Sequence, residues 1–473
     1  MVAAFAPLGW WPLALAAPAA LIALWRSAQS ARAAAFMGFA FGLGLFGVGV
    51  SWVYVSLHRF GGMPGPLAAV ATLGFCAVLA LYPAAVGWLQ ARIGAPHRAH
   101  AVLAVPALWT LAEWLRGWLL TGFPWLATGY AFVPTPLAGF APLGGVYLVG
   151  LIAWLAAGLI VWGVALGRRQ GLAAAAAAGT LFALGFALEG IEWTAAAGKP
   201  VRVSLLQGNI PQEMKFDEAR YARIVDTYLR LAEESDAQLI VLPETALPRF
   251  LDTVAPATLE RLEAAARRRG GDLLLGVPVR EPGGRYYNSV VTLGVSPRQR
   301  YDKVHLVPFG EFVPPGFGWV LAVLRIPLSD FTAGPPRQAP LAVAGQRIAV
   351  SICYEDAFGD EVLRQLPQAT ILANVSNVAW FGDSLAPAQH LQIAQLRAIE
   401  TRREMLTATN TGHTAVIARD GRRVVLPPFV EGRLQLSVQG HAGATPYVRL
   451  GDAAALALAA LMALAAIRLA RRR

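Results

Sequence analysis

The chain has 473 residues, of which 56% are hydrophobic and only 15% are charged, a composition that excludes a single soluble globular domain. The net charge of +11 does not indicate a nucleic-acid-binding groove, because many arginines stand in short segments between apolar runs. Two cysteines, Cys76 and Cys353, exclude a disulfide framework. The sequence therefore predicts a membrane protein that also carries a soluble domain.

Seven apolar stretches are long enough to cross a bilayer, which takes about 20 helical residues. They run over 7–25, 33–57, 66–90, 101–120, 145–166, 171–190 and 452–469. Arginines follow alternate stretches, and the positive-inside rule places such clusters on the cytoplasmic face. We therefore expect a bundle of about six spans over 1–194, an outside domain over 195–448, and a C-terminal membrane helix with a basic cytoplasmic tail over 449–473.

In the outside domain, predicted strands and helices alternate along the chain. Apolar runs with the period of a strand stand at 201–206, 239–242, 273–277, 348–352, 370–375, 405–409 and 414–418, and hairpin-like strands surround 286–289. Helical patterns stand at 218–234, 256–269, 356–366 and 387–403. This alternation is typical of an α/β domain whose sheets are covered by helices.

Three side chains that can take part in chemistry stand at or just past the carboxyl ends of predicted strands, where α/β domains build their sites. They are Glu244, Lys303 and Cys353. Cys353 falls on a tight turn after strand 348–352, a position that exposes a thiol above a sheet with main-chain N–H groups nearby for an oxyanion. Taken singly, each residue also has a structural interpretation, as a cap, a solvated charge and core packing. Together they supply a base, a cation and a soft nucleophile.

The order Glu, Lys, Cys resembles the carbon–nitrogen hydrolase (nitrilase) superfamily, whose members use this triad in an α-β-β-α sandwich. Such a domain placed before the last span of a membrane bundle resembles the bacterial apolipoprotein N-acyltransferase family. The short motifs that carry the resemblance are GGMPG at 61–65, LTGFPW at 120–125, QGNIPQ at 207–212, the stretch from His305 to Pro314, CYE at 353–355 and AWFG at 379–382. Family members usually have eight spans, so the resemblance implies that this chain starts at the second. They also usually have tryptophan where Phe216 stands here.

The resemblance implies transfer of an acyl chain from a phospholipid, through a thioester on Cys353, to the N-terminal amine of S-diacylglyceryl-cysteine in apolipoproteins. Glu244 would be the base, and Lys303 with the N–H of Tyr354 would stabilise the oxyanion. The implied location is the bacterial inner membrane, with the catalytic domain on the periplasmic face. We expect a monomer that contacts membrane lipids, with no cofactor, no metal and no nucleic acid.

Supporting roles are expected for residues around the triad. Glu311 would orient Lys303, as the resemblance suggests, or anchor its loop. Glu355 would position the site or cap the next helix. The aromatic residues Tyr354, Trp380 and Phe216 are expected to line the acyl pocket, and core packing is the alternative for Tyr354 and Trp380.

Two other functions stay open from the sequence. An amidase with the same triad would use water in place of the amine, although a soluble amide substrate requires no membrane bundle. A scaffold or transporter is the other alternative. The spans contain almost no ionisable residues for a polar pathway, which argues against it. Asn288 is expected to satisfy a turn, and His305 is not needed by the triad.

Overall fold

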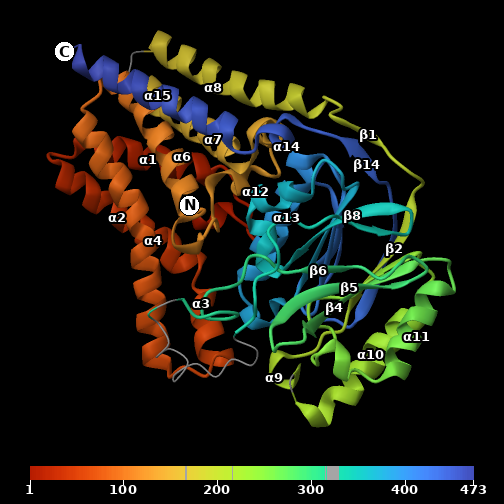
Figure 1. Cartoon of the computed structure of the whole chain (residues 1–473). Coiled ribbons are helices and arrows are strands. Elements are labelled where there is room, and N and C mark those ends of the chain that lie inside the picture. The colour runs from red at the N-terminus through yellow and green to blue at the C-terminus, as the bar shows by residue number, and fades with distance from the viewer. Residues whose placement is uncertain (166–167, 216, 315, 317–329, 473) are drawn as a thin grey trace. The chain divides into compact units, whose positions relative to one another are not determined.

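The computed structural model describes residues 1–165, 168–215, 217–314, 316 and 330–472 (Figure 1). The chain forms two compact units. The first comprises 1–54, 66–192 and 445–473, and the second comprises 55–65 and 193–444. A short segment between two membrane helices therefore groups with the second unit.

The first unit is helical. Its helices are α1 (Leu13–Ser27), α2 (Ala31–Gly49), α3 (Trp52–Val55), α4 (Gly65–Ile93), α5 (His97–Ala99), α6 (Val105–Arg116), α7 (Ala141–Val164), α8 (Arg168–Glu189), α14 (Pro446–Leu450) and α15 (Ala453–Arg471). Within the described residues, five helical segments are long and apolar enough to cross a membrane, namely Ala31–Gly49, Gly65–Ile93, Pro136–Val164, Arg169–Glu189 and Ala453–Arg471. These segments overlap five of the seven expected spans, although α2 ends at Gly49, well before the expected end of its span at residue 57.

The other two expected spans, 7–25 and 101–120, differ in the structure. The first corresponds to α1, which has 15 residues, and the second to α6, which has 12 residues and follows a π-helical turn. The helix α6 ends at Arg116, whose guanidinium donates to the main-chain carbonyl of Trp125 at 2.7 Å. Leu120 then adopts a left-handed φ of 55°, which is incompatible with a continuing helix. The predicted helical run to residue 120 is therefore wrong.

The second unit contains two six-stranded sheets. The first has the order β13-β2-β3-β4-β5-β6, with β13 (Gly432–Val438), β2 (Val201–Gln207), β3 (Leu239–Val241), β4 (Asp272–Arg280), β5 (Tyr286–Gly294) and β6 (Arg300–Asp302). The second has the order β12-β11-β10-β9-β8-β7, with β12 (Arg423–Leu426), β11 (Thr414–Ile417), β10 (Met405–Thr409), β9 (Ile371–Ser376), β8 (Gln346–Ile352) and β7 (Leu341–Val343). A separate pair joins β1 (Thr194–Ala196) to β14 (His441–Gly443) in antiparallel register.

The central strands of each sheet are parallel, and the outer strands are antiparallel. β2, β3 and β4 pair in parallel, as do β8, β9 and β10. Parallel strands need crossover connections, which here include helices. The carboxyl ends of the parallel strands in each sheet therefore lie along one edge, where the loops that follow them can meet.

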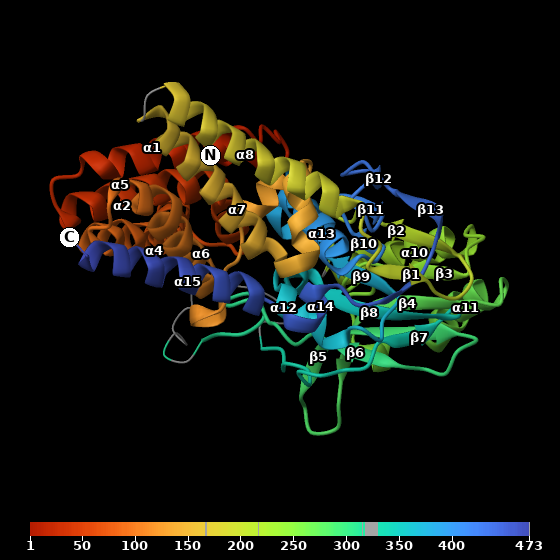
Figure 2. The ribbon, with the colours of Figure 1, turned by 90° about the horizontal axis from the view of Figure 1, so that it is seen from above.

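Helices cover the outer faces of the two sheets. The inner faces share one apolar core, in which Leu205 and Val241 of the first sheet join Val350 and Ile371 of the second. The outer face of the first sheet is covered by α10 (Tyr221–Glu233) and α11 (Pro256–Arg267), whereas α13 (Ala386–Thr401) packs against β10 and β11 of the second. Figure 2 shows α13 and the α10–α11 pair on opposite sides of the strands. The α-β-β-α sandwich is thereby confirmed.

Most predicted strands and helices of this unit are confirmed, but the helix expected over 356–366 is wrong. The segment consists of a 3-10 turn at Cys353–Ala357, α12 (Gly359–Val362) and a second 3-10 turn at Leu363–Gln365. Phe358 interrupts it with an extended backbone of φ −100° and ψ 93°. The acidic side chains at the start of the segment are used elsewhere, because Glu355 and Asp356 bond to other parts of the site. These contacts favour short turns over one continuous helix.

Candidate active site

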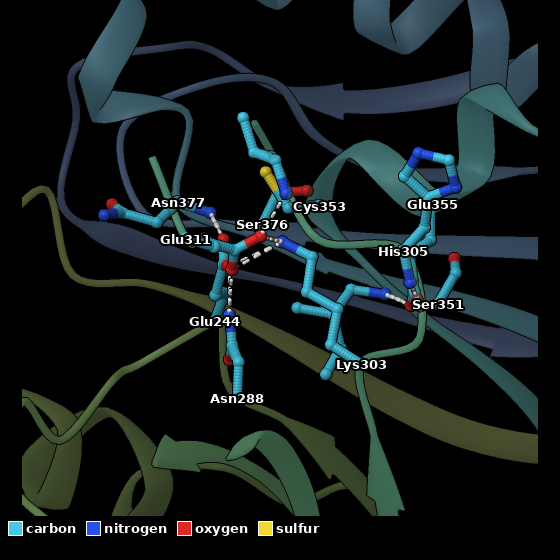
Figure 3. A network of polar contacts seen from close by, with 12 residues as sticks. Glu244, Asn288, Lys303, His305, Glu311, Ser351, Cys353, Glu355, Ser376 and Asn377 are labelled. Carbon is cyan, nitrogen blue, oxygen red and sulfur yellow. Dashed lines mark hydrogen bonds and ion pairs between the residues drawn. The ribbon is translucent and has the colours of Figure 1, made fainter. Parts of the chain in front are cut away.

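The three triad residues lie at or just past the carboxyl ends of strands. Cys353 follows β8, Lys303 follows β6, and Glu244 stands three residues past the end of β3. Cys353 has a left-handed φ of 55°, and Thr245, next to Glu244, has a φ of 48°. Such backbone angles are costly for residues other than glycine and concentrate at functional sites. Figure 3 shows the Cys353 sulfur, the Lys303 ammonium and the carboxylates of Glu244 and Glu311 gathered in one place.

The turn that carries Cys353 is held from below by polar side chains. Its main-chain carbonyl accepts a hydrogen bond of 2.9 Å from Asn374, and its main chain is also bonded by the ring of His390. The thiol itself makes a side-chain hydrogen bond with Glu244. Burial raises the pKa of the Cys353 thiol well above its ordinary value, and the nearby Glu244 charge raises it further. The resting nucleophile is therefore a neutral thiol that needs a base.

Glu244 has the properties of that base. The residue is 6% exposed, and its carboxylate accepts hydrogen bonds of 2.7 Å from Asn288 Nδ2 and from the main-chain N–H of Asn377. Burial alone would raise its pKa, but the ammonium groups of Lys303 and Lys215, with these hydrogen bonds, hold the pKa of Glu244 below its ordinary value. An ionised carboxylate thus faces a neutral thiol, as general-base catalysis requires.

Lys303 is a buried cation shared by two carboxylates. Its Nζ lies 2.8 Å from Glu311 and 3.5 Å from Glu244, and the side chain is 1% exposed. Burial alone would lower the pKa of Lys303, but Glu311 and Glu244 raise it above its ordinary value. Glu311 also accepts a hydrogen bond of 2.9 Å from the N–H of Val307. The geometry therefore allows Glu311 both roles that the sequence left open, the orientation of Lys303 and the anchoring of its loop.

Asn288 is a member of the site that the sequence did not reveal. The expectation that it satisfies a turn is wrong, because it lies within β5 and its Nδ2 donates to Glu244 at 2.7 Å and to Glu311 at 2.9 Å. The main-chain carbonyl of Asn288 also accepts a hydrogen bond of 2.8 Å from the main-chain N–H of Lys303. One amide thereby holds two carboxylates together around the cation. The signal that could have found it was strand pairing, since β5 is the neighbour of β6.

Lys215 is a second residue that sequence reasoning missed. It ends the short helix α9 (Gln212–Lys215), and its Nζ donates to the main-chain carbonyl of Glu244 at 3.1 Å. The side chain is buried, with 3% exposed. Its place in a four-residue helix after a turn gave no periodic pattern from which the contact could be predicted.

Glu355 braces the site from behind. Its Oε1 accepts from the N–H groups of Val304 at 2.6 Å and His305 at 3.1 Å, and its Oε2 accepts from the N–H of Ile352 at 2.7 Å and from the hydroxyl of Tyr301 at 3.1 Å. In Figure 3 it lies beside His305, on the far side of Lys303 from the Cys353 sulfur. It therefore joins the segment of Lys303 to the turn of Cys353.

The expected aromatic residues lie on two sides of the turn. The ring of Tyr354 packs edge-to-face against His305 and Phe358. Trp380 packs edge-to-face against Phe60, and its main-chain carbonyl accepts a hydrogen bond of 2.8 Å from Ser56. Phe216 lies outside the described residues.

The chemistry available here is acyl transfer through a covalent thioester. The ionised Glu244 faces the neutral thiol of Cys353, and the buried ammonium of Lys303 can stabilise an oxyanion. Across the described ranges, no three side chains of His, Cys, Asp and Glu are grouped so that they could hold a metal ion. The residues present are suited to transfer of an acyl group from an ester or amide.

Comparisons with known proteins agree with this chemistry. The family model described as apolipoprotein N-acyltransferase N-terminal domain matches residues 1–159, and the carbon-nitrogen hydrolase model matches residues 202–447. The chain is 49% identical to the apolipoprotein N-acyltransferase of Nitrosomonas europaea, over 98% of this chain and 94% of that protein. It is 46% identical to the Ralstonia nicotianae enzyme of the same name (99% and 91%) and 47% identical to that of Methylococcus capsulatus (97% and 92%). The chain belongs to the apolipoprotein N-acyltransferase family.

Proposed function

We propose that this acyltransferase moves an acyl chain from a phospholipid to the N-terminal amine of a diacylglyceryl-modified apolipoprotein, through a thioester on Cys353. The observation that supports the proposal most directly is the ionised Glu244 carboxylate bonded to the neutral Cys353 thiol, with Lys303 beside both. This arrangement supplies every group that two successive acyl transfers need.

In the first half-reaction, the Cys353 sulfur attacks the ester carbonyl while Glu244 takes the thiol proton. The oxyanion that forms is stabilised by the Lys303 ammonium and by the N–H of Tyr354; loss of one such donor typically costs about 100- to 1000-fold in rate. The ester bond then breaks, and the glycerol oxygen takes the proton from Glu244. A lysophospholipid leaves, and the acyl chain stays on sulfur.

In the second half-reaction, the amine of the apolipoprotein attacks the thioester. Glu244, now ionised again, accepts the amine's proton, the carbon–sulfur bond breaks, and the proton returns to sulfur. The kinetics are ping-pong because the first product leaves before the second substrate reacts. Tyr354, Trp380 and Phe216 would line the acyl pocket, Glu311 would orient Lys303, and Glu355 would fix the spacing of the two loops.

The test is the stoichiometry of the two products. The purified full-length protein is incubated with phospholipid and a diacylglyceryl-cysteine peptide, beside Cys353→Ala. We expect equal amounts of lysophospholipid and N-acylated peptide from the wild type and neither from the variant. Lysophospholipid with free fatty acid in place of acylated peptide would instead support the hydrolase alternative.

The proposal also places the catalytic domain, 195–448, on the periplasmic face of the bacterial inner membrane, between a bundle over 1–194 and a final helix over 449–473. The exposed Lys199 and Arg472 would then lie on opposite sides. A membrane-impermeant maleimide added from the periplasmic side should label Lys199→Cys and leave Arg472→Cys unlabelled. The reverse pattern would contradict the assigned face. We further propose that the enzyme acts as a monomer, which light scattering of the purified protein would check.

A further inference from the structure

Lysine is rare in this chain, and its few positions are not random. Only 3 of the 40 basic residues are lysines. Lys199 is exposed, whereas Lys303 and Lys215 are buried beside Glu244. Arginine presents a wide planar fork, and lysine presents a compact charge whose pKa responds to burial. The two buried lysines therefore stand where a small cation fits next to the base.

Packing alone does not explain why the ammonium group of Lys215 is buried. Its Nζ donates to the main-chain carbonyl of Glu244 at 3.1 Å, and within the described residues it makes no other hydrogen bond. A buried ammonium with only one protein acceptor is costly unless nearby negative charge compensates it. That charge is present, because Glu244 and the ionised form of Cys353 both act favourably on Lys215.

Among the lysines and glutamates that contact Glu244 or Lys303, the charges balance only when Lys215 is counted. Glu244 and Glu311 bring two negative charges, and Lys303 alone brings one positive charge to both. Without a second cation the buried site would hold one uncompensated negative charge, which favours uptake of a proton by a carboxylate. A protonated Glu244 could not accept the thiol proton.

We propose that Lys215 is the second cation of the active site, a positioning residue that keeps Glu244 ionised as the base for Cys353. The proposal deepens the proposed function and rests on it for the acyl-transfer step, though not for the reactivity of the thiol. The hydrogen bond from Lys215 to the Glu244 carbonyl also fixes the strained turn at Thr245, whose φ is 48°.

The protonation state of Lys215 fits this role. Burial lowers the pKa of Lys215 to about 8, although Glu244 and Cys353 act to raise it. The side chain is therefore a cation at neutral pH and below, which is the range in which Glu244 must stay ionised. Lys303, Glu311 and His390 are the other charged groups that act on this carboxylate or on its partner cation, and the variants below leave all three unchanged.

The test uses the pH dependence of Cys353 alkylation by iodoacetamide, read on the Cys353 peptide of the intact purified protein. In the wild type the alkylation rate should fall at acidic pH as Glu244 takes up a proton, and we call this fall the acidic limb of the profile. The Glu244→Gln variant should lack the acidic limb, which would assign the limb to the protonation of Glu244. In Lys215→Met we expect the limb to move to higher pH by about one unit, because an opposite charge within about 4–6 Å lowers a carboxylate pKa by about 1–3 units.

Two further variants separate charge from hydrogen bonding. Lys215→Gln keeps a donor for the Glu244 carbonyl without the charge and should shift the limb like the methionine variant, so a poorly folded Lys215→Met leaves the test intact. The exposed Lys199→Met is the matched control and should leave the limb in place. Acidic limbs that coincide in wild type, Lys215→Met and Lys215→Gln would overturn the proposal.

A second readout separates this proposal from the proposed function. At a pH below the midpoint of the wild-type acidic limb, Lys215→Gln should form the acyl-enzyme about tenfold more slowly than the wild type, because a rise of about one unit in the pKa of Glu244 leaves about tenfold less ionised base there. A wild type that forms no acyl-enzyme would contradict the proposed function. The alkylation profile, which needs no lipid, would still decide the role of Lys215.

Discussion

Glu355 accepts a hydrogen bond of 2.6 Å from the main-chain N–H of Val304, and this contact ties the cation of the site to its nucleophile. The same carboxylate accepts from the N–H of Ile352 at 2.7 Å. Val304 follows Lys303 and Ile352 precedes Cys353 in the chain, so one buried side chain sets the distance between the two loops. Glu355 makes these contacts with both of its oxygens, so each oxygen has to accept a hydrogen bond.

Replacement of Glu355 by glutamine should therefore damage the site although its size hardly changes. One of the two oxygens becomes an NH₂ group that faces N–H donors, and an unsatisfied buried donor costs about 1–3 kcal/mol. We expect a lower unfolding temperature and acyl-enzyme formation slowed by about 5- to 150-fold, the factor to which an energy of about 1–3 kcal/mol corresponds. The exposed Glu260→Gln is the control; equal behaviour of both variants would show that Glu355 is not a brace.

Asn288 should be sensitive to charge more than to size. Its amide donates to both Glu244 and Glu311, and Asn288→Asp would replace that donor with a third carboxyl group. Like charges in one buried site raise carboxyl pKa values, so part of the base would be protonated at neutral pH. We expect N-acylation of the peptide to fall by about tenfold for each unit by which the carboxyl pKa rises above the assay pH. Asn288→Ala, which removes the donor without adding charge, should lose less N-acylation activity. Equal activities of the aspartate and alanine variants would contradict this account.

The pair formed by His390 and Asp356 predicts a pH dependence of stability. Both side chains are buried, with His390 Nε2 and Asp356 Oδ1 2.7 Å apart, and the ring also bonds the main chain of Cys353. Burial alone would lower the pKa of His390, but the Asp356 carboxylate raises it above its ordinary value, and Glu244 acts in the same direction. Because the folded pKa is raised, this stabilisation is complete below about pH 6.5 and is lost as pH rises through the folded value.

The measurement is the unfolding temperature of the purified protein between about pH 6 and 9. The wild type should lose stability over this range, and His390→Gln should lose less because it cannot carry the charge. A matched substitution at the partly exposed His413 should keep the wild-type slope. Parallel curves for wild type and His390→Gln would show that the pair does not titrate in this window.

The sequence predicted those parts of the site that follow directly from strand ends. A buried strand has a clear apolar pattern, and the residues after it stand at the sheet edge, so the pattern of strands was enough to place Cys353 and Glu244 at such edges. Lys303 follows β6, for which no strand was expected, and was found through the resemblance of its motif. The sandwich was also predictable, although through a resemblance of short motifs more than through periodicity.

The parts that could not be predicted depend on contacts between distant segments. Asn288 is central because β5 lies beside β6, and Lys215 because a short helix packs its ammonium against a strand end. The expected helix over 356–366 failed because Glu355 bonds to the main chain of Val304 and His305 and Asp356 bonds to His390 of α13, contacts that helical propensity does not register. The run to residue 120 failed for a similar reason, since Arg116 caps a turn with main-chain carbonyls.

The most direct test of the account is the location of the acyl group on the enzyme. The purified protein is incubated with phospholipid alone, digested and analysed by peptide mass spectrometry, beside Glu244→Gln. We predict an acyl-sized mass increase on the Cys353 peptide, removed by hydroxylamine and by a diacylglyceryl-cysteine peptide, and absent from the variant. An acyl group on any other residue, or an undiminished adduct in Glu244→Gln, would contradict the thioester mechanism with Glu244 as its base.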